Sequence, residues 1–372
     1  MKELGLYIHI PFCKQKCKYC DFISYADKNS FIEEYVNTII KEIEQNKKLA
    51  EDYEVSTIYF GGGTPSYIES NYIVEILSII KENYNVQENA EITIEVNPGT
   101  TNKEKLKKYY NAGINRLSIG LQTNNNDLLK LIGRIHSYKD FLETYNTARI
   151  VGFKNINVDL MIGLPKQTIE DVENVLKETI ILNPEHISVY SLIVEEETPL
   201  EKEIQKGILK LPDEKIERNE YWLVKNTLEK TGYKHYEISN YAKKGFESKH
   251  NLNCWEQKEY LGFGLAAHSY LNKIRYSNTE SLEEYLKNNN ITIHEKQDKE
   301  LEEKEYMLLG LRKIDGIKIS EFKNKFVDNP IYVFKNELNK LVENNLIEVD
   351  VDAIKLTNKG IDLANIVWEE FV

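Results

Sequence analysis

Residues 7–22 read YIHIPFCKQKCKYCDF, and this stretch holds three of the four cysteines of the chain. Cys13, Cys17 and Cys20 follow a short apolar run in the spacing Cys-x3-Cys-x2-Cys. A disulfide takes two thiols, and a closed zinc site takes four ligands. The rest of the chain therefore has to show which group would use three thiolates on one loop.

The amino-acid composition excludes some classes of protein. The 372 residues include 48 Lys and Arg against 60 Asp and Glu, a net charge of -12, without any block rich in Lys and Arg. Such a chain lacks the basic surface of a nucleic-acid-binding protein. No stretch reaches the roughly 20 apolar residues that span a bilayer. Clustered cysteines favour metal or cluster ligation in a reducing compartment. We therefore expect a cytoplasmic protein without a transmembrane segment, with membrane contact left open through its partners.

Short apolar, β-branched runs alternate with segments of helical spacing over the first 240 residues. The runs lie at 4–10, 55–60, 91–96, 116–121, 155–164 and 186–194. After the first run, Phe31, Tyr35, Ile39 and Ile43 recur every four residues on one helical face. Strands separated by helices predict parallel βαβ units. Six units in a row favour an α/β barrel, complete or partial, over an open doubly wound sheet.

Polar residues or glycines stand near the end of each apolar run. In an α/β barrel, the chemistry lies at the C-terminal ends of the strands. The residues at these ends are the three cysteines, GGGTPS at 61–66, Glu95, Asn97, Gln122, Asp159, Tyr190 and Ser191. They predict a single polar mouth at one end of the barrel.

The three thiols allow more than one interpretation. Soft thiolates select zinc, copper(I) or iron–sulfur clusters. Zinc would need a fourth ligand, for which His9 is the nearest candidate. A cubane cluster normally takes four thiolates, so three would leave one iron free to bind a small molecule. We favour such a cluster, with zinc and inert buried thiols as the alternatives.

The cysteine spacing, with Tyr19 before the last cysteine, resembles the radical S-adenosylmethionine (SAM) superfamily. The motifs YIHIPFC, YCDF, IYFGGGTPS, IEVNP, GLQT, GRIHS and DLMIGLP occur in this order over residues 7–165. Together they resemble the oxygen-independent coproporphyrinogen-III oxidase-like family. The resemblance implies a partial (β/α)6 barrel and a [4Fe–4S] cluster on Cys13, Cys17 and Cys20, whose free iron binds SAM. In that superfamily the cluster reduces SAM, and the cofactor carries the radical chemistry.

The resemblance also implies a set of SAM-binding residues. Tyr19 would lie against the adenine, and backbone groups of Gly62 and Gly63 with the Thr64 hydroxyl would meet the ammonium or carboxylate. The other matching positions are Tyr7, Glu95, Gln122, Arg134 and Asp159. An unpaired acid in an apolar strand, such as Glu95, is costly, and a ligand cation or an internal arginine would offset that cost. The structural alternatives are packing for both tyrosines, a plain turn for the glycines, and an Arg134–Asp159 ion pair.

Two features distinguish the branches of this family. The true oxidase decarboxylates two propionates of coproporphyrinogen III, and its motif continues past the third cysteine with Gly and a fourth Cys. Here Asp21 and Phe22 follow Cys20, which resembles the HemW-type heme chaperones that bind heme and deliver it to acceptor proteins. That branch carries His-Asn-x-x-Tyr-Trp. This chain reads HNLNCW at 250–255, so Cys254 stands where tyrosine is expected.

The resemblance makes His250 the candidate for contact with heme iron, because imidazole is a natural axial ligand. A histidine that only orders its loop is the alternative, and His268 and Cys254 rank below His250. We expect a heme chaperone that keeps the SAM-binding cluster and has heme-accepting proteins as partners, respiratory hemoproteins among them. The alternative is a radical SAM enzyme of the coproporphyrinogen oxidase type, against which the missing fourth cysteine argues.

The chain is expected to have three parts. These are a radical SAM α/β barrel over 1–240, a connecting region with the HNxxxW motif over 241–300, and a small C-terminal winged-helix-like α+β domain over 301–372. The last part combines helical segments with the short β runs LIEVD and AIKLT. Because it offers no basic recognition helix, we expect a lid or partner surface there and not a DNA-binding surface.

Overall fold

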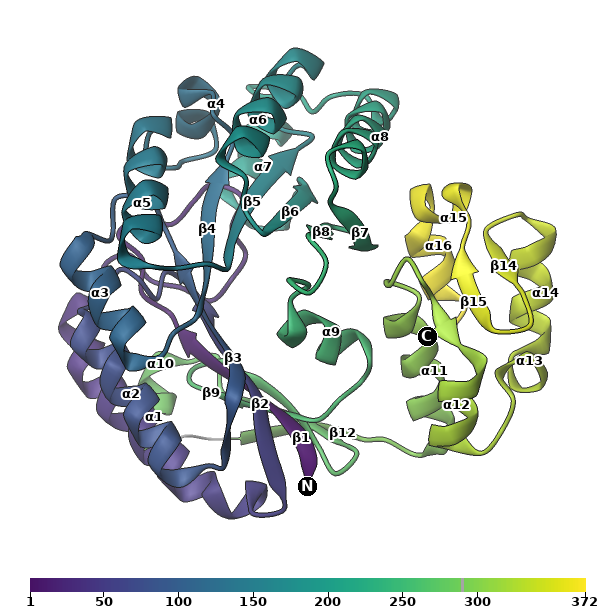
Figure 1. The fold of residues 1–372 in the computed structure, drawn as a ribbon, viewed down its shortest axis with the longest axis horizontal. Helices are drawn as coiled ribbons and strands as arrows, with labels where there is room; N and C mark the ends of the chain where they lie inside the picture. The colour runs from purple at the N-terminus through teal and green to yellow at the C-terminus, as the bar shows by residue number, and fades with distance from the viewer. Residues whose placement is uncertain (289–290) are drawn as a thin grey trace.

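The computed structural model describes residues 1–288 and 291–372 (Figure 1). Six parallel strands lie side by side in sequence order at the centre of one sheet. They are β1 (Lys2–Ile10), β2 (Tyr53–Gly62), β3 (Val86–Val96), β4 (Arg116–Gln122), β5 (Ile156–Ile162) and β6 (His186–Ser191). In the described residues, no pairing joins the two ends of the sheet. The prediction of a partial (β/α)6 barrel is therefore confirmed.

The helices that follow these strands lie mostly on the outer face of the sheet (Figure 1). They are α1 (Ile32–Asn46), α2 (Ser70–Asn83), α3 (Lys103–Ala112), α4 (Asn126–Leu131), α5 (Tyr138–Val151), α6 (Ile169–Leu182), α7 (Pro199–Gln205) and α8 (Glu214–Lys230), with 3-10 turns at Asn29–Phe31 and Lys47–Ala50. Tyr35, Ile39 and Ile43 are buried on α1, as their spacing predicts, whereas Phe31 lies in the preceding 3-10 turn. Because side chains alternate along a strand, the other face of the sheet is left for polar residues.

The sheet extends beyond the six strands on both sides, which the sequence did not reveal. Its order is β12-β11-β10-β9-β1-β2-β3-β4-β5-β6-β8-β7. The added strands are short: β7 (Lys234–Glu237), β8 (Asn240–Ala242), β9 (Tyr260–Phe263), β10 (His268–Leu271), β11 (Ile274–Asn278) and β12 (Ile291–Lys296). Helices α9 (Lys249–Trp255) and α10 (Leu282–Asn288) lie between them in the chain. Helix α9 carries the HNLNCW sequence and contacts both β2 and α11.

A second, three-stranded antiparallel sheet of order β13-β15-β14 forms the centre of the C-terminal unit. Its elements are α11 (Lys299–Gly310), β13 (Ile317–Lys318), α12 (Ile319–Phe326), α13 (Pro330–Val333), α14 (Lys335–Glu343), β14 (Ile347–Val349), β15 (Ala353–Leu356), α15 (Asn358–Asp362) and α16 (Ala364–Glu369). This small α+β unit agrees with the predicted fold class. The predicted boundaries after residues 240 and 300 stay a prediction.

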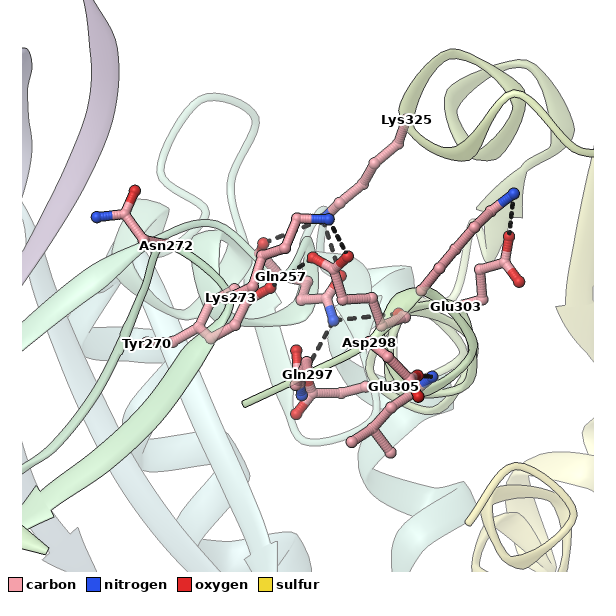
Figure 2. A network of polar contacts seen from close by, with 12 residues as sticks. Gln257, Tyr270, Asn272, Lys273, Gln297, Asp298, Glu303, Glu305 and Lys325 are labelled. Carbon is pink, nitrogen blue, oxygen red and sulfur yellow. Dashed lines mark hydrogen bonds and ion pairs between the residues drawn. The ribbon is translucent and has the colours of Figure 1, made fainter. Parts of the chain in front are cut away.

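Polar contacts attach the C-terminal unit to the sheet extension (Figure 2). Lys325 of α12 donates to the backbone and side-chain oxygens of Gln257, at 3.2 and 2.8 Å. Glu305 of α11 accepts from Gln257 at 2.8 Å and forms an ion pair with Arg275 of β11 at 2.6 Å. Burial lowers the pKa of Lys325 to about 8. These contacts hold the turn after α9 and the β10–β11 hairpin against one face of the C-terminal unit.

Among the described residues, the helices are all too short or too polar to cross a membrane.

Candidate functional site

A cavity of about 390 Å³ lies at the C-terminal ends of the parallel strands. It collects predicted site residues from four strands, β2 to β5, and from nearby loops. Those in its lining are Cys13, Cys17, Cys20, Tyr19, Gly62, Gly63, Thr64, Glu95, Gln122, Arg134 and Asp159. Tyr7 and His250 are outside the lining. The expected polar mouth is therefore present, and the SAM-binding roles of these residues stay predictions.

The cysteine loop is fixed from both sides. The Cys13 N–H donates to Tyr25 O at 2.9 Å, and the Lys18 N–H donates to Ile132 O at 3.0 Å. The Thr64 hydroxyl contacts Cys13 Sγ at 3.5 Å. Cys13 is buried, whereas Cys17 and Cys20 are half-buried and open toward the cavity. Three soft sulfur donors on a fixed loop are a donor set that fits an iron–sulfur cluster.

The zinc alternative named His9 as a fourth ligand. Both ring nitrogens of His9 are already engaged, with the Tyr7 hydroxyl at 3.1 Å and Ile23 O at 3.0 Å. Within 1–288 and 291–372, no three His, Cys, Asp or Glu side chains are grouped around a single ion position. His9 therefore acts as a bridge between β1 and the end of the cysteine loop.

The glycine turn after β2 is packed closely against the cysteine loop. A Cβ atom on Gly63 would lie 3.1 Å from Cys13 Sγ and 3.0 Å from Ile10 O, and one on Gly62 would lie 2.5 Å from the His9 ring. Gly62 also has a φ of 106°. Only glycine lets the backbone come this close. The Gly63 N–H donates to Ile10 O at 2.9 Å, so contact with SAM would fall to the carbonyl oxygens of this turn.

Glu95 is an acid without a cationic partner. It lies on β3 at the cavity wall, and its Oε1 accepts a 2.9 Å hydrogen bond from the Tyr59 hydroxyl. Burial raises the pKa of Glu95 to about 8. No ion pair involves Glu95 in the part of the chain that the structure describes, and the Arg116 charge acts on it only from a distance. A buried carboxyl of this kind suits a ligand cation such as the ammonium of SAM.

Arg134 and Asp159 do not pair with each other. Arg134 Nη2 donates to Asn97 Oδ1 and Gly120 O, both at 2.9 Å, and its Nη1 lies 3.6 Å from Cys17 Sγ. Its buried Nε has no partner among the described residues. Asp159 instead accepts hydrogen bonds from Asn157 at 2.6 Å and Ser118 at 3.1 Å. The guanidinium is thus held in the cavity wall next to Cys17, without an ion pair to Asp159.

Three further predicted residues, Tyr19, Gln122 and Tyr7, have different surroundings. Tyr19 packs against an apolar cluster that includes Leu128 and Met161, at the edge of the cavity. Gln122 ends β4 with a φ of 68° and faces the cavity. Tyr7 points along the inner face of the sheet and stacks on Tyr59 at 6.3 Å between ring centroids. Tyr7 therefore contacts the site through Tyr59 and His9.

His250 lies outside the cavity, on α9. It is 8% exposed, its Nδ1 is 2.9 Å from the Thr57 hydroxyl, and its ring stacks on Tyr59 at 5.1 Å. Burial and the nearby Arg116 charge lower its pKa to about 4, so the imidazole is neutral at pH 7. Cys254 is half-buried on the same helix, and Trp255 packs under Arg312 at 4.4 Å. The motif thus joins the barrel to the C-terminal unit.

Two further residues, Tyr59 and Arg116, face inward and were not predicted from the sequence. Tyr59 links the cavity to α9, because its hydroxyl bonds to Glu95 while its ring covers His250. Arg116 is 2% exposed, and its Nε has no partner among the described residues. The alternation of Arg116 and Ser118 with Leu117 and Ile119 in β4 is the signal that could have indicated an inward-facing arginine.

Comparison with known proteins agrees with these observations. A family model described as "Radical SAM superfamily" matches residues 7–179, and one described as "HemN C-terminal domain" matches residues 298–363. The heme chaperone HemW of Lactococcus lactis is 36% identical over 100% of this chain and 98% of that protein. HemW of Bacillus subtilis is 38% identical over 98% of both chains.

The solved structure of coproporphyrinogen III oxidase (HemN) from Escherichia coli, described as a radical SAM enzyme, superposes with a TM-score of 0.86 at 25% identity. That comparison covers 100% of this chain and 90% of the other. Membership of the radical SAM superfamily implies a [4Fe–4S] cluster and SAM. The full-length similarity to two heme chaperones also identifies the branch of this superfamily. The chain belongs to the heme chaperone HemW family of the radical SAM superfamily.

Proposed function

We propose that this protein binds heme and delivers it to acceptor proteins, while holding a [4Fe–4S] cluster on Cys13, Cys17 and Cys20 with SAM beside it. The observation that carries the proposal is the combination of full-length similarity to heme chaperones with Asp21 and Phe22 in place of a further cysteine. The place of action is the cytoplasm, with any membrane contact made through partners. Respiratory hemoproteins are the proposed acceptors.

The residues of the cavity would hold the cofactors in a defined way. The three thiols would ligate the cluster, which when bound supplies one-electron reduction of SAM. Arg134 would place its positive charge near a carboxylate, and Glu95 would receive an ammonium group. The close contact of Gly63 with Cys13 would keep the ligand next to the cysteine loop. Thr64, Gln122, Asp159 and Tyr19 would complete the wall around it.

His250 remains the proposed heme residue of the HNLNCW motif. Its imidazole is neutral, and this is the form that ligates iron. Its stacking on Tyr59 would connect heme bound near α9 with the state of the SAM cavity. In the described conformation, however, His250 is buried, so direct ligation would require α9 to move away from β2.

The alternative function is a radical SAM enzyme acting on a porphyrinogen. The observation that favours it is the nearly complete set of SAM residues around one cavity, which a simple carrier has no need of. Product analysis with coproporphyrinogen III, SAM and a reductant distinguishes the two. An enzyme would release carbon dioxide and 5′-deoxyadenosine in proportion to substrate, and a chaperone would leave the propionates intact.

A heme titration tests the proposal. The protein is reconstituted with iron and sulfide under anaerobic conditions, and hemin is added while optical absorption is recorded. We expect saturable, stoichiometric binding by the wild type and weaker binding by His250→Ala. His235→Ala is the matched control, because His235 is also buried but packs against Tyr221 and Tyr241. No binding by cluster-loaded protein would refute the chaperone function.

A further inference from the structure

The histidines of this chain divide sharply by exposure. The chain has seven histidines, and two of them, His268 and His294, are exposed. The buried ones are His9, His136, His186, His235 and His250. A group that enters from solution and leaves to a partner protein needs an iron ligand that solvent can reach. Among the histidines, only the exposed two meet that requirement without a change in conformation.

The two exposed histidines form a pair across three strands. His268 begins β10 and His294 lies in β12, yet their rings are 5.4 Å apart between centroids and only 14° from parallel. The Ser277 hydroxyl of β11, which lies between them, is 2.6 Å from His294 Nε2. A register shift between Arg275 and Tyr276 bends the pairing of β11 with β12 at this point. Such irregularities re-aim a side chain, here toward its neighbour.

The pair lies on the same face of the sheet as the SAM cavity. Gly5 and Tyr7 of β1 are opposite Tyr260 and Gly262 of β9, and Tyr260 is opposite Tyr270 of β10. Residues opposite each other share a face, and so do residues two apart. His268 therefore continues the inner face that carries Tyr7. Because β10 runs antiparallel to β9, its first residue is also at the sheet end where the cysteine loop lies.

The ring nitrogens of the pair are available for a ligand. His268 makes no hydrogen bond with any described residue, and His294 uses only Nε2. Partial desolvation by its surroundings, together with His294 and Arg275, lowers the pKa of His268, while Glu280 acts in the opposite direction. His268 is therefore neutral at pH 7. Both ring nitrogens of His268 are therefore free for a ligand in its neutral, iron-binding form, and Ser277 fixes the ring of His294 beside it.

We propose that the His268–His294 pair is a second heme site, where heme from solution is first bound and from which it is handed on. This inference rests on the proposed heme chaperone function. A bare divalent ion in a structural site takes about four ligands, and no third His, Cys, Asp or Glu joins the pair within the described residues. Heme iron brings four nitrogens of its own and needs only an axial ligand, so one or two imidazoles suffice. His268 is the ligand, and His294, oriented by Ser277, is the positioning residue.

The test compares hemin binding by anaerobically reconstituted variants. For His268→Ala with His294→Ala, we expect an affinity lower by about tenfold or more, and slower association, than for the wild type. His268→Tyr provides a signature that packing alone would not produce: heme is still bound, but the absorption and EPR spectra change to those of a tyrosinate ligand. Thermal unfolding of each variant checks that the surface substitutions leave the fold intact.

The outcomes separate the two proposals. No hemin binding by the wild type would refute the chaperone function itself. Wild-type binding that the double variant retains, with unchanged affinity, association rate and spectra, would overturn the exposed pair as a heme site and leave the chaperone function standing. Tight binding of Zn²⁺ by the pair, with hemin binding unaffected by its loss, would likewise overturn it.

Discussion

Tyr59, in the lining of the cavity at the strand ends, donates a 2.9 Å hydrogen bond to Glu95. The ring of Tyr59 also stacks on His250, so Tyr59 contacts both Glu95 and the HNLNCW motif. The pair has a direct consequence for protonation. Because burial outweighs the hydrogen bond, the pKa of Glu95 is raised from 4.5 to about 8, and the carboxyl carries a proton at pH 7.

This protonation predicts proton release on SAM binding. An ammonium group next to Glu95 favours the carboxylate, so binding at pH 7 should expel up to one proton. Calorimetry of SAM binding to cluster-loaded protein, in buffers of different ionisation enthalpy, measures that number. Glu95→Gln should bind SAM more weakly and without this release, whereas Glu91→Gln, in a matched control on the same strand, should keep it. Proton release of equal size in Glu95→Gln would contradict the assignment.

The same pKa shift makes stability depend on pH. Between pH 4.5 and about 8 the folded chain binds the Glu95 proton while the unfolded chain has lost it. Free energy of unfolding without SAM therefore falls as pH rises through this range. Urea unfolding at pH 5 and pH 8 should show a smaller decrease for Glu95→Gln than for the wild type. An identical pH slope in both proteins would be inconsistent with a buried, protonated Glu95.

Cluster ligation is predicted to depend on three of the four cysteines. Serine substitution of Cys13, Cys17 or Cys20 should abolish iron and sulfide uptake during reconstitution, because each thiolate holds a different iron. Cys254→Ser is the control, since Cys254 lies on α9, away from the cavity lining. Iron and labile sulfide content report the result. Loss of the cluster in Cys254→Ser, or its retention in the loop variants, would refute this ligand set.

The glycine turn predicts a stability difference between two matched substitutions. Gly62 and Gly99 both have positive φ, at 106° and 81°, so alanine at either adds about 1 kcal/mol of backbone strain. Only at Gly62 would the new Cβ meet another group, the His9 ring at 2.5 Å. Gly62→Ala should therefore cost about 1–3 kcal/mol more than Gly99→Ala in chemical unfolding. Equal losses would mean that the turn can move away from His9.

Attachment of the C-terminal unit is predicted to depend on Arg312. Its guanidinium lies 4.4 Å from the Trp255 ring of α9 and 4.6 Å from the Trp368 ring of α16. Arg312→Ala should lower stability by about 1–2 kcal/mol and expose the C-terminal unit to limited proteolysis. Lys225→Ala, which removes a cation 5.6 Å from the single ring of Trp222, should have little effect. Equal protease resistance in both variants would contradict a role for the stacked arginine.

The residues explain how far the sequence could predict this structure. Long alternating runs and unusual polar residues marked β1 to β6 and the cavity, because a strand end that carries Cys, Gly or Glu has few purely structural uses. The strands β7 to β11 are three to five residues long, and their pairing depends on distant partners such as Gly5 with Tyr260. Local pattern carries little information about such contacts.

Three finer features of the structure also lay beyond the sequence, for physical reasons. An Arg134–Asp159 pair was a reasonable alternative by charge, but Asn97 and Gly120 satisfy the guanidinium, and Asn157 and Ser118 satisfy the carboxylate. The burial of His250 follows from α9 packing on β2, which no local spacing indicates. The stacking of His268 on His294 needs the hairpin register, so the sequence alone could not bring those two rings together.

Delivery of heme to an acceptor, as distinct from heme binding, defines the proposed function. The most direct measurement is the rate at which heme leaves the reconstituted, heme-loaded protein, recorded in stopped-flow absorption with two recipients. Excess apomyoglobin gives the rate of passive dissociation, and membranes containing heme-depleted respiratory hemoproteins give the rate of transfer. We predict that transfer to the membranes is faster than dissociation and slows when the cluster is absent. Equal rates with both recipients, independent of the cluster, would contradict the chaperone function.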